Sequence, residues 1–255
     1  MTVTGFLKLL IRLPLLVLWT IGMFSLRLCA RPLTLIAEPS EIRLRSLLFR
    51  VWGRGAIFLL GGRIRAVGPR PRAPFLLVSN HLSYVDIVGS AALLGSAFVA
   101  KSEIARWPVI GFCARHLQTL FINRDHRKDV IRVKDQVWNV FQDGYGLHIF
   151  AEGGISQNLQ VQPFKPALFD AAVRNRVPVH YVAISYRTPE GTPPPSETVA
   201  WLAGKSLARH LLDLLAGHGF EAVFTFCEEP VQGDCRKTLA DELTSKVRTL
   251  YSPVE

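Results

Sequence analysis

Short apolar runs alternate with helix-like stretches over the last two thirds of the chain, and this alternation restricts the fold most. The runs that predict strands, each bounded by turn residues, cover 75–79, 119–123, 147–150, 177–185 and 221–226. The stretches that predict helices cover 85–98, 126–143, 167–175, 205–216 and 235–250. Because strands that alternate with helices form layered sheets, we expect an α/β fold, a layered mixed sheet flanked by helices.

The N-terminal segment adds an apolar helix beside basic residues. Residues 13–26 form a 14-residue stretch without charge between Arg12 and Arg27. A helix that spans a bilayer needs about 20 apolar residues, so this stretch predicts a short anchor that enters one leaflet. Lys8, Arg12, Arg27 and Arg31 would then reach the lipid headgroups. A full span and a signal peptide are the alternatives, although no small-x-small cleavage site follows.

A second helix is predicted over about 40–60. Apolar residues recur at i, i+3, i+4 and i+7 from Leu44 to Val51, and the arginines at 43, 50 and 54 fall largely on another face. A basic amphipathic helix is typical of a membrane surface or of docking on a domain. We therefore expect residues 1–60 to form a membrane-associated helical pair, a monotopic or single short anchor, and 61–255 to form the globular domain.

The positive charge is confined to the N-terminal part. The formal net charge is +10, and residues 1–72 alone hold 12 basic against 2 acidic side chains. The rest of the chain is balanced, whereas a nucleic-acid-binding protein would carry basic residues on its folded body. We expect a membrane surface with anionic headgroups as partner and no nucleic acid, the alternative being a solvated basic surface. The four cysteines have no paired spacing, and no metal-ligand motif is present.

One polar segment directly follows the first predicted strand, Asn80-His-Leu-Ser-Tyr-Val-Asp86. A carboxylate on one ring nitrogen of a histidine fixes the tautomer and leaves the other nitrogen free to accept a proton. His81 and Asp86 are therefore candidates for a general base and its partner. Taken alone, the spacing also fits a histidine that caps a helix.

Four sequence blocks lie near strand ends: NHLSYVD at 80–86, LFINR at 120–124, FAEGGIS at 150–156 and VPVHYVAISY at 177–186. Their order and spacing resemble the glycerolipid acyltransferase family, which includes bacterial 1-acylglycerol-3-phosphate acyltransferases. The first block of that family is NHxSxxD, which Asn80, His81, Ser83 and Asp86 match in full. The resemblance covers roughly residues 73–250.

The resemblance implies an enzyme of lipid biosynthesis on the cytoplasmic face of a bacterial inner membrane. His81 would deprotonate the free hydroxyl of a lysolipid acceptor, and this hydroxyl would attack the thioester of acyl-CoA or acyl carrier protein directly. Asp86 would orient His81, and no cofactor besides the acyl donor is implied. The expected substrate-binding residues are Asn80, Ser83, Arg124, Glu152 and Gly153.

Two of these assignments have plain alternatives. Arg124, which would bind an anionic headgroup, could instead pair with Asp125 or Asp129 on the surface. Gly153, which would let a ligand approach the backbone, could instead serve an ordinary turn.

The third block departs from the pattern FPEGTRS of the family. Its proline, threonine and arginine are replaced by Ala151, Gly154 and Ile155. The run VQPFKPALF at 161–169 and Trp201 resemble the branch that contains lyso-ornithine lipid acyltransferases, whose acceptors need not carry a phosphate. The acceptor, 1-acylglycerol-3-phosphate or lyso-ornithine lipid, therefore stays open. A catalytically inactive lipid-binding protein on the same fold is the alternative function.

Overall fold

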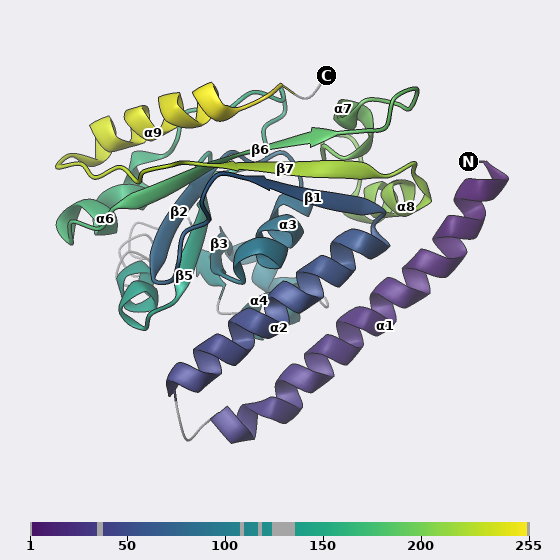
Figure 1. Ribbon diagram of the computed structural model, residues 1–255, viewed down its shortest axis with the longest axis horizontal. Coiled ribbons are helices and arrows are strands. Elements are labelled where there is room, and N and C mark those ends of the chain that lie inside the picture. The colour runs from purple at the N-terminus through teal and green to yellow at the C-terminus, as the bar shows by residue number, and fades with distance from the viewer. Residues whose placement is uncertain (1, 35–37, 108–109, 117–118, 124–135, 254–255) are drawn as a thin grey trace.

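The computed structural model describes residues 2–34, 38–107, 110–116, 119–123 and 136–253. Within these residues the chain forms one seven-stranded sheet with the order β1-β7-β6-β2-β5-β3-β4, covered by helices (Figure 1). The strands are β1 Gly62–Val67, β2 Phe75–Ser79, β3 Ala97–Lys101, β4 Leu120–Ile122, β5 Gly146–Phe150, β6 Val179–Arg187 and β7 Phe220–Phe226. The main helices are α1 Val3–Thr34, α2 Glu38–Leu59, α3 Val85–Leu94, α4 Ile110–His116, α6 Asp170–Arg174, α7 Pro195–Thr198, α8 Leu207–Ala216 and α9 Arg236–Leu250. Two short 3-10 turns, Ser102–Arg106 and Pro166–Phe169, complete the described elements.

The sheet is mixed, as expected, because β6 and β7 pair antiparallel while the other neighbours run parallel. Strand β2 lies in the middle and all five of its residues are buried, as a continuous apolar strand of a covered parallel sheet must be. Its register places Ser79 beside Phe150 of β5 and Val182 of β6. The segments that follow β2 and β5 therefore leave the sheet at the same edge.

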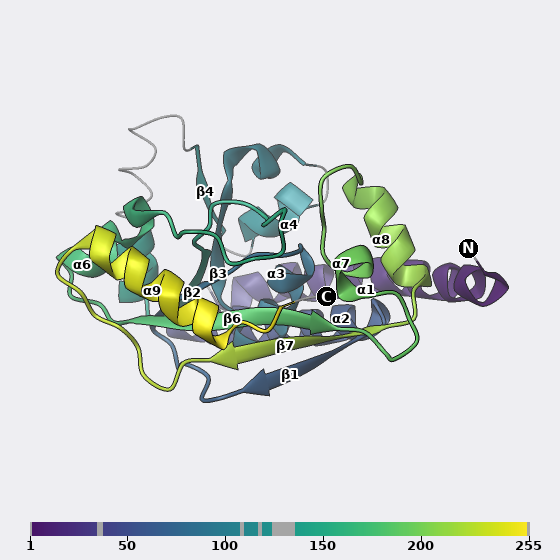
Figure 2. The ribbon, with the colours of Figure 1, turned by 90° about the horizontal axis from the view of Figure 1, so that it is seen from above.

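Two helical layers cover the two faces of the sheet, and each encloses its own hydrophobic cluster. On one face, Leu239, Leu243 and Val247 of α9 pack with the buried residues of α6. On the other face lie α2, α3 and α8, with α1 outside α2 (Figures 1 and 2). The N-terminal helices thus belong to the face that also carries α3.

Helix α2 is part of the core of the body. Its residues Phe49 and Ile57, and Leu60 just after its end, are buried in the cluster with α3. At the crossing, a Cβ on Gly53 would lie 2.5 Å from the backbone nitrogen of Ala92, so only glycine allows this approach of the two helices. The prediction that residues 1–60 form a separate anchoring unit stays a prediction, but α2 contributes to the folding of the sheet domain.

Helix α1 differs from the short anchor that the charge-free stretch predicted. It runs for 32 residues, and the segment Val3–Ala30 is long and apolar enough to cross a membrane by length and composition. Three of its basic residues contact the protein. Lys8 Nζ donates to the carbonyl of Gly217, just beyond α8, and Arg12 Nη1 donates to the carbonyl of Leu215, near the end of α8. Arg27 pairs with Glu41 of α2. In this structure these three side chains bind the protein, and their contact with headgroups stays a prediction; the side chain of Arg31, the fourth residue of that prediction, lies outside the described part.

The secondary structure departs from the prediction at two further places. Strand β1 was not expected, and the helix expected over 85–98 ends at Leu94, where Gly95 adopts φ 62° and β3 follows. Gly95 stops the helix because its left-handed backbone suits glycine. Of the helix expected over 126–143, residues 136–142 are helical and the first ten lie outside the described residues.

Candidate active site

The candidate site is centred on a hydrogen bond between His81 and Asp86. Nδ1 of His81 lies 2.7 Å from Oδ2 of Asp86. The Asp86 side chain is fully buried, whereas that of His81 retains 13% exposure. Among the described residues no hydrogen bond engages Nε2 of His81. The imidazole is thus held from one side and open for proton transfer on the other.

Asp86 is held by donors from its own loop and from a distant strand. Its Oδ2 also accepts from the backbone amides of Leu82 at 2.7 Å and Ser83 at 2.9 Å. Its Oδ1 accepts a hydrogen bond from the hydroxyl of Tyr186 on β6. Asp86 lies in the first turn of α3, where the helix dipole favours a negative charge. These donors fix the carboxylate without help from solvent.

Asn80 fastens the site loop to β6. Its Nδ2 donates to Ile184 O and its Oδ1 accepts from Ile184 N, each at 2.8 Å, so the side chain continues the pairing of β2 with β6. Ser83 is also fully buried, and its Oγ accepts from the amide of Val85 at the start of α3. In this structure both side chains position the loop, and their predicted contact with substrate stays a prediction.

An aromatic stack supports the ring of His81. The ring of Phe150, at the end of β5, stacks on it with a centroid distance of 4.1 Å and an interplanar angle of 20°. Behind Phe150 lies His148, whose Nε2 contacts Ser79 Oγ at 2.8 Å. Complete burial, and secondarily the nearby His81, lower the pKa of His148 from 6.5 to about 3. His148 therefore stays neutral and places no second positive charge beside the base.

Glu152 follows Phe150 and lies in the same site. Its side chain is largely buried, and Oε1 accepts from the amide of Gln162 at 3.1 Å. Oε2 is buried, and no described residue forms a hydrogen bond with it. Burial raises the pKa of Glu152 from 4.5 to about 8, although the backbone amides of Gln162 and His81 act in the opposite direction. A protonated Glu152 would be a hydrogen-bond donor next to the His81–Asp86 pair.

The remaining predicted site residues are Gly153 and Arg124. Gly153 adopts φ 90° and its amide donates to Phe150 O, so a tight turn explains this glycine and its role in substrate binding stays a prediction. Arg124 lies outside the described residues. Sequence reasoning missed Tyr186 and Phe150 as neighbours of the base, and the only signal was their place within the fourth and third blocks.

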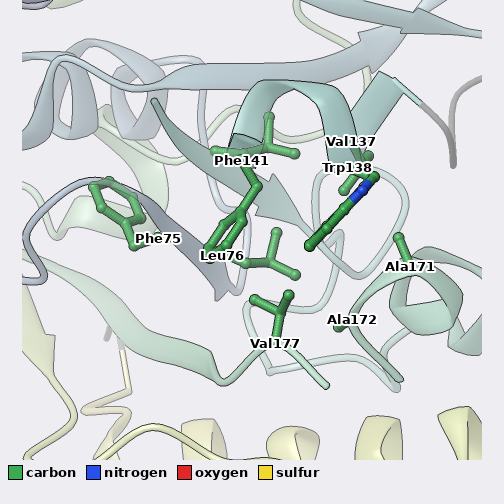
Figure 3. A pocket seen from close by; sticks show the side chains of 9 residues that line it. Phe75, Leu76, Val137, Trp138, Phe141, Ala171, Ala172 and Val177 are labelled. Carbon is green, nitrogen blue, oxygen red and sulfur yellow. The ribbon is translucent and has the colours of Figure 1, made fainter. Parts of the chain in front are cut away.

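The small space drawn in Figure 3 lies away from the site. Its volume is about 10 Å³, which is barely one water molecule. Its lining is apolar and comes from the N-terminal end of β2, from residues 136–142 and from α6. The lining residues are Phe75, Leu76, Val137, Trp138, Phe141, Leu147, Ala171, Ala172 and Val177. It is a packing gap in the core under α6.

The fold and the site together define a class: an α/β protein that presents a carboxylate-held histidine at the edge of a mixed sheet. The model of the acyltransferase family matches residues 63–185, which include His81, Asp86 and Glu152. Lyso-ornithine lipid O-acyltransferase of Brucella abortus is 36% identical over 207 residues, which cover 75% of this chain and 77% of that protein. The chain belongs to the acyltransferase family.

Further relatives agree with this assignment. Lyso-ornithine lipid O-acyltransferase of Pseudomonas aeruginosa is 34% identical over 80% of this chain and 78% of its own length. The 1-acyl-sn-glycerol-3-phosphate acyltransferase of Neisseria gonorrhoeae is 36% identical over 136 residues, and this match spans about half of either chain (52% and 53%). The crystal structure of the 1-acyl-sn-glycerophosphate acyltransferase PlsC from Thermotoga maritima has the same fold, with a TM-score of 0.68, 21% identity and coverage of 96% and 95%.

Proposed function

We propose that this protein transfers a fatty acyl group from acyl-CoA or acyl carrier protein to the free hydroxyl of a lysolipid, with His81 as general base. The observation that carries the proposal is the bond of His81 Nδ1 to the buried Asp86, which leaves Nε2 open. The names of the relatives supply the substrate class.

The geometry supports a direct transfer. Asp86 holds the proton on Nδ1, so Nε2 accepts the proton of the acceptor hydroxyl as its oxygen attacks the thioester carbon. The resulting imidazolium is stabilised by Asp86 and by the ring of Phe150 stacked on it. When the carbon–sulfur bond breaks, Nε2 returns the proton to the leaving thiolate. The products are the acylated lipid and the free thiol of the carrier.

Of the two acceptors, lyso-ornithine lipid has the stronger support. Relatives named for it align with 75% and 80% of this chain, whereas the Neisseria 1-acylglycerol-3-phosphate enzyme aligns with 52%. Ile155 also stands where the phosphate-binding pattern has an arginine. We expect purified protein to acylate lyso-ornithine lipid at least tenfold faster than 1-acylglycerol-3-phosphate at equal concentration. The reverse preference would contradict this choice of acceptor.

The enzyme activity itself is tested by substitution of the base. We expect His81→Ala to abolish transfer of a radiolabelled acyl group, and the exposed His218→Ala to leave it unchanged. Transfer that survives in His81→Ala would eliminate the general-base mechanism. Binding of lysolipid without transfer in the unaltered protein, with either donor, would instead favour the inactive lipid-binding protein.

We propose that α1 attaches the protein to the cytoplasmic face of a bacterial inner membrane. Its outer face carries exposed apolar side chains at helical spacing, Leu7, Ile11, Leu18 and Ile21, while Lys8 and Arg12 bind the body. Leu18→Asp combined with Ile21→Asp should shift the protein from the membrane pellet to the supernatant. The exposed Val67→Asp on β1 is the matched control. Retention of the double variant in a salt-washed pellet would refute attachment through this face.

A further inference from the structure

The two oxygens of Asp86 are held in different ways. Oδ2 receives three donors from the loop, namely His81 Nδ1 and the amides of Leu82 and Ser83. Oδ1 accepts from Tyr186, which is 100 residues away in the sequence. Within the described part of the chain, Tyr186 is the hydrogen-bond donor that the structure gives to Oδ1. The loop therefore orients one oxygen and the sheet the other.

The Tyr186 hydroxyl is fixed by the sheet. Its residue is 2% exposed, pairs with Ala222 of β7, and packs its ring edge-on against Phe220 at 6.0 Å between centroids. Burial, followed by the charge of Asp86, raises the pKa of the phenol well above 10. Tyr186 is thus a neutral donor at neutral pH and up to at least pH 9, held in one position by β6 and β7.

We propose that Tyr186 is a positioning residue of the acyl transfer: its hydroxyl fixes Asp86 and moderates the negative charge that Asp86 presents to His81. This inference rests on the proposed function. A donor on Oδ1 draws charge away from Oδ2, because hydrogen bonds to a carboxylate stabilise its charged form. Without that donor, Asp86 would attract the proton on His81 more strongly and would lose one of its constraints.

The opposing view is that Tyr186 only fills the core. Its ring does belong to the hydrophobic cluster with α2 and α3, so removal of the whole side chain would not distinguish the two roles. Tyr186→Phe removes the hydroxyl alone and keeps the ring. Tyr181→Phe is the matched control, since Tyr181 lies on the same strand and packs against the cluster on the opposite face.

The first measurement is kinetic. Tyr186→Phe should lower kcat for acyl transfer by roughly tenfold, because Asp86 loses the hydrogen bond that holds Oδ1 and then orients His81 less well, with KM for the lysolipid unchanged. Tyr181→Phe should leave both constants within twofold. In the Asp86→Asn background, Tyr186→Phe should have little further effect, because residues that act through one another are not additive. Equal effects of Tyr186→Phe in both backgrounds would overturn the proposal.

The second measurement does not need activity. In full-length protein labelled with ¹⁵N-histidine in detergent, the His81 signal is identified by its loss in His81→Ala and followed from pH 5 to 9. We expect its protonation midpoint to rise in Tyr186→Phe, because Asp86 without its donor attracts the proton more strongly, and to stay the same in Tyr181→Phe. Neither substitution removes another titratable group around the pair. These groups are Tyr84 on the loop, His148 on β5 and Glu152 after β5.

The two measurements separate the possible failures. An unchanged His81 midpoint in Tyr186→Phe would overturn the positioning role even if acyl transfer is confirmed. A shifted midpoint in a protein that acylates no lysolipid would refute the proposed function and retain the coupling of Tyr186 to His81 through Asp86.

Discussion

Substitution of Asp86 by asparagine removes the charge of the site with little change of shape. If the amide oxygen of the asparagine faces the loop, it can accept from His81 and from the amides of Leu82 and Ser83, as Oδ2 of Asp86 does. The amide nitrogen then faces Tyr186, whose hydroxyl oxygen can accept a hydrogen bond. Asp86→Asn should therefore fold and keep the orientation of His81.

The cost appears when His81 becomes positively charged during transfer. Two unit charges at the observed 2.7 Å attract by about 6 kcal/mol at an effective dielectric constant of about 20, which sets an upper bound. The lower bound is the difference between charged and neutral hydrogen bonds, about 1–1.5 kcal/mol. We take about 2–4 kcal/mol in between, which corresponds to a loss of kcat of about 30- to 1,000-fold.

The assay is acyl transfer to the preferred lysolipid at saturating donor and acceptor, with thermal unfolding of the same preparations as a control. KM should change little, because Asp86 is buried behind His81 and does not reach the acceptor. A variant that keeps kcat within threefold of the unaltered protein would refute the role of the Asp86 charge. A variant with a large loss of thermal stability would refute the argument that asparagine fits.

Three further substitutions test the surroundings of the pair. Phe150→Leu should lower kcat about twofold to thirtyfold, because an aromatic ring stabilises a neighbouring cation by about 0.5–2 kcal/mol. An unchanged kcat would exclude this contribution. The pKa of Glu152 is raised from 4.5 to about 8, so between these pH values the folded protein keeps a proton that the unfolded chain releases. The free energy of unfolding therefore falls as the pH rises from 4.5 to 8, by up to about 1.4 kcal/mol per pH unit. Urea unfolding at pH 5 and 8 should show a weaker fall in Glu152→Gln, and parallel slopes would contradict the raised pKa. The pKa of His148 is lowered from 6.5 to about 3, so below pH 6.5 the unfolded chain binds a proton that the folded protein does not, and the free energy of unfolding falls. Between pH 7 and 5 this free energy should fall less in His148→Phe than in the unaltered protein. An equal fall would show that His148 is not buried as a neutral ring.

The strands that the sequence predicted have a local apolar pattern, whereas the strands that it did not predict have no pattern that sets them apart from their neighbours in the chain. Residues 75–79 form a continuous apolar run between turn residues, which predicts a buried strand without knowledge of its partners. Strand β1 is an edge strand whose two arginines are exposed, and its partner β7 lies more than 150 residues away. Its sequence resembles a basic surface segment, so no local pattern distinguishes it. Strand β3 follows Gly95, where apolar residues continue and only the glycine marks the change from helix.

In the candidate site, too, local contacts could be predicted from the sequence and contacts between distant segments could not. The His81–Asp86 pair is a local signal, five residues apart at the end of a strand, and the structure joins the two side chains as the sequence predicted. The contacts of Asp86 with Tyr186 and of His81 with Phe150 are not local, because each arises from the register of β2 with its neighbours. Tyrosine and phenylalanine are common strand residues, so their identity alone gave no reason to place them beside the base.

The basic residues of α1 connect the fold to the proposed attachment. Lys8 and Arg12 bind carbonyls at and just beyond the C-terminal end of α8, and Arg27 binds Glu41 of α2. Cations at the C-terminal end of a helix are favoured by its dipole, so these contacts define which side of α1 faces the protein. The exposed apolar side chains of α1, such as Leu7, Ile11 and Leu18, therefore point away from the body. Helix α1 cannot rotate about its axis without breaking the contacts of Lys8, Arg12 and Arg27. If α1 enters the membrane as proposed, the same contacts set the height of the sheet edge, and hence of His81, above the lipid surface.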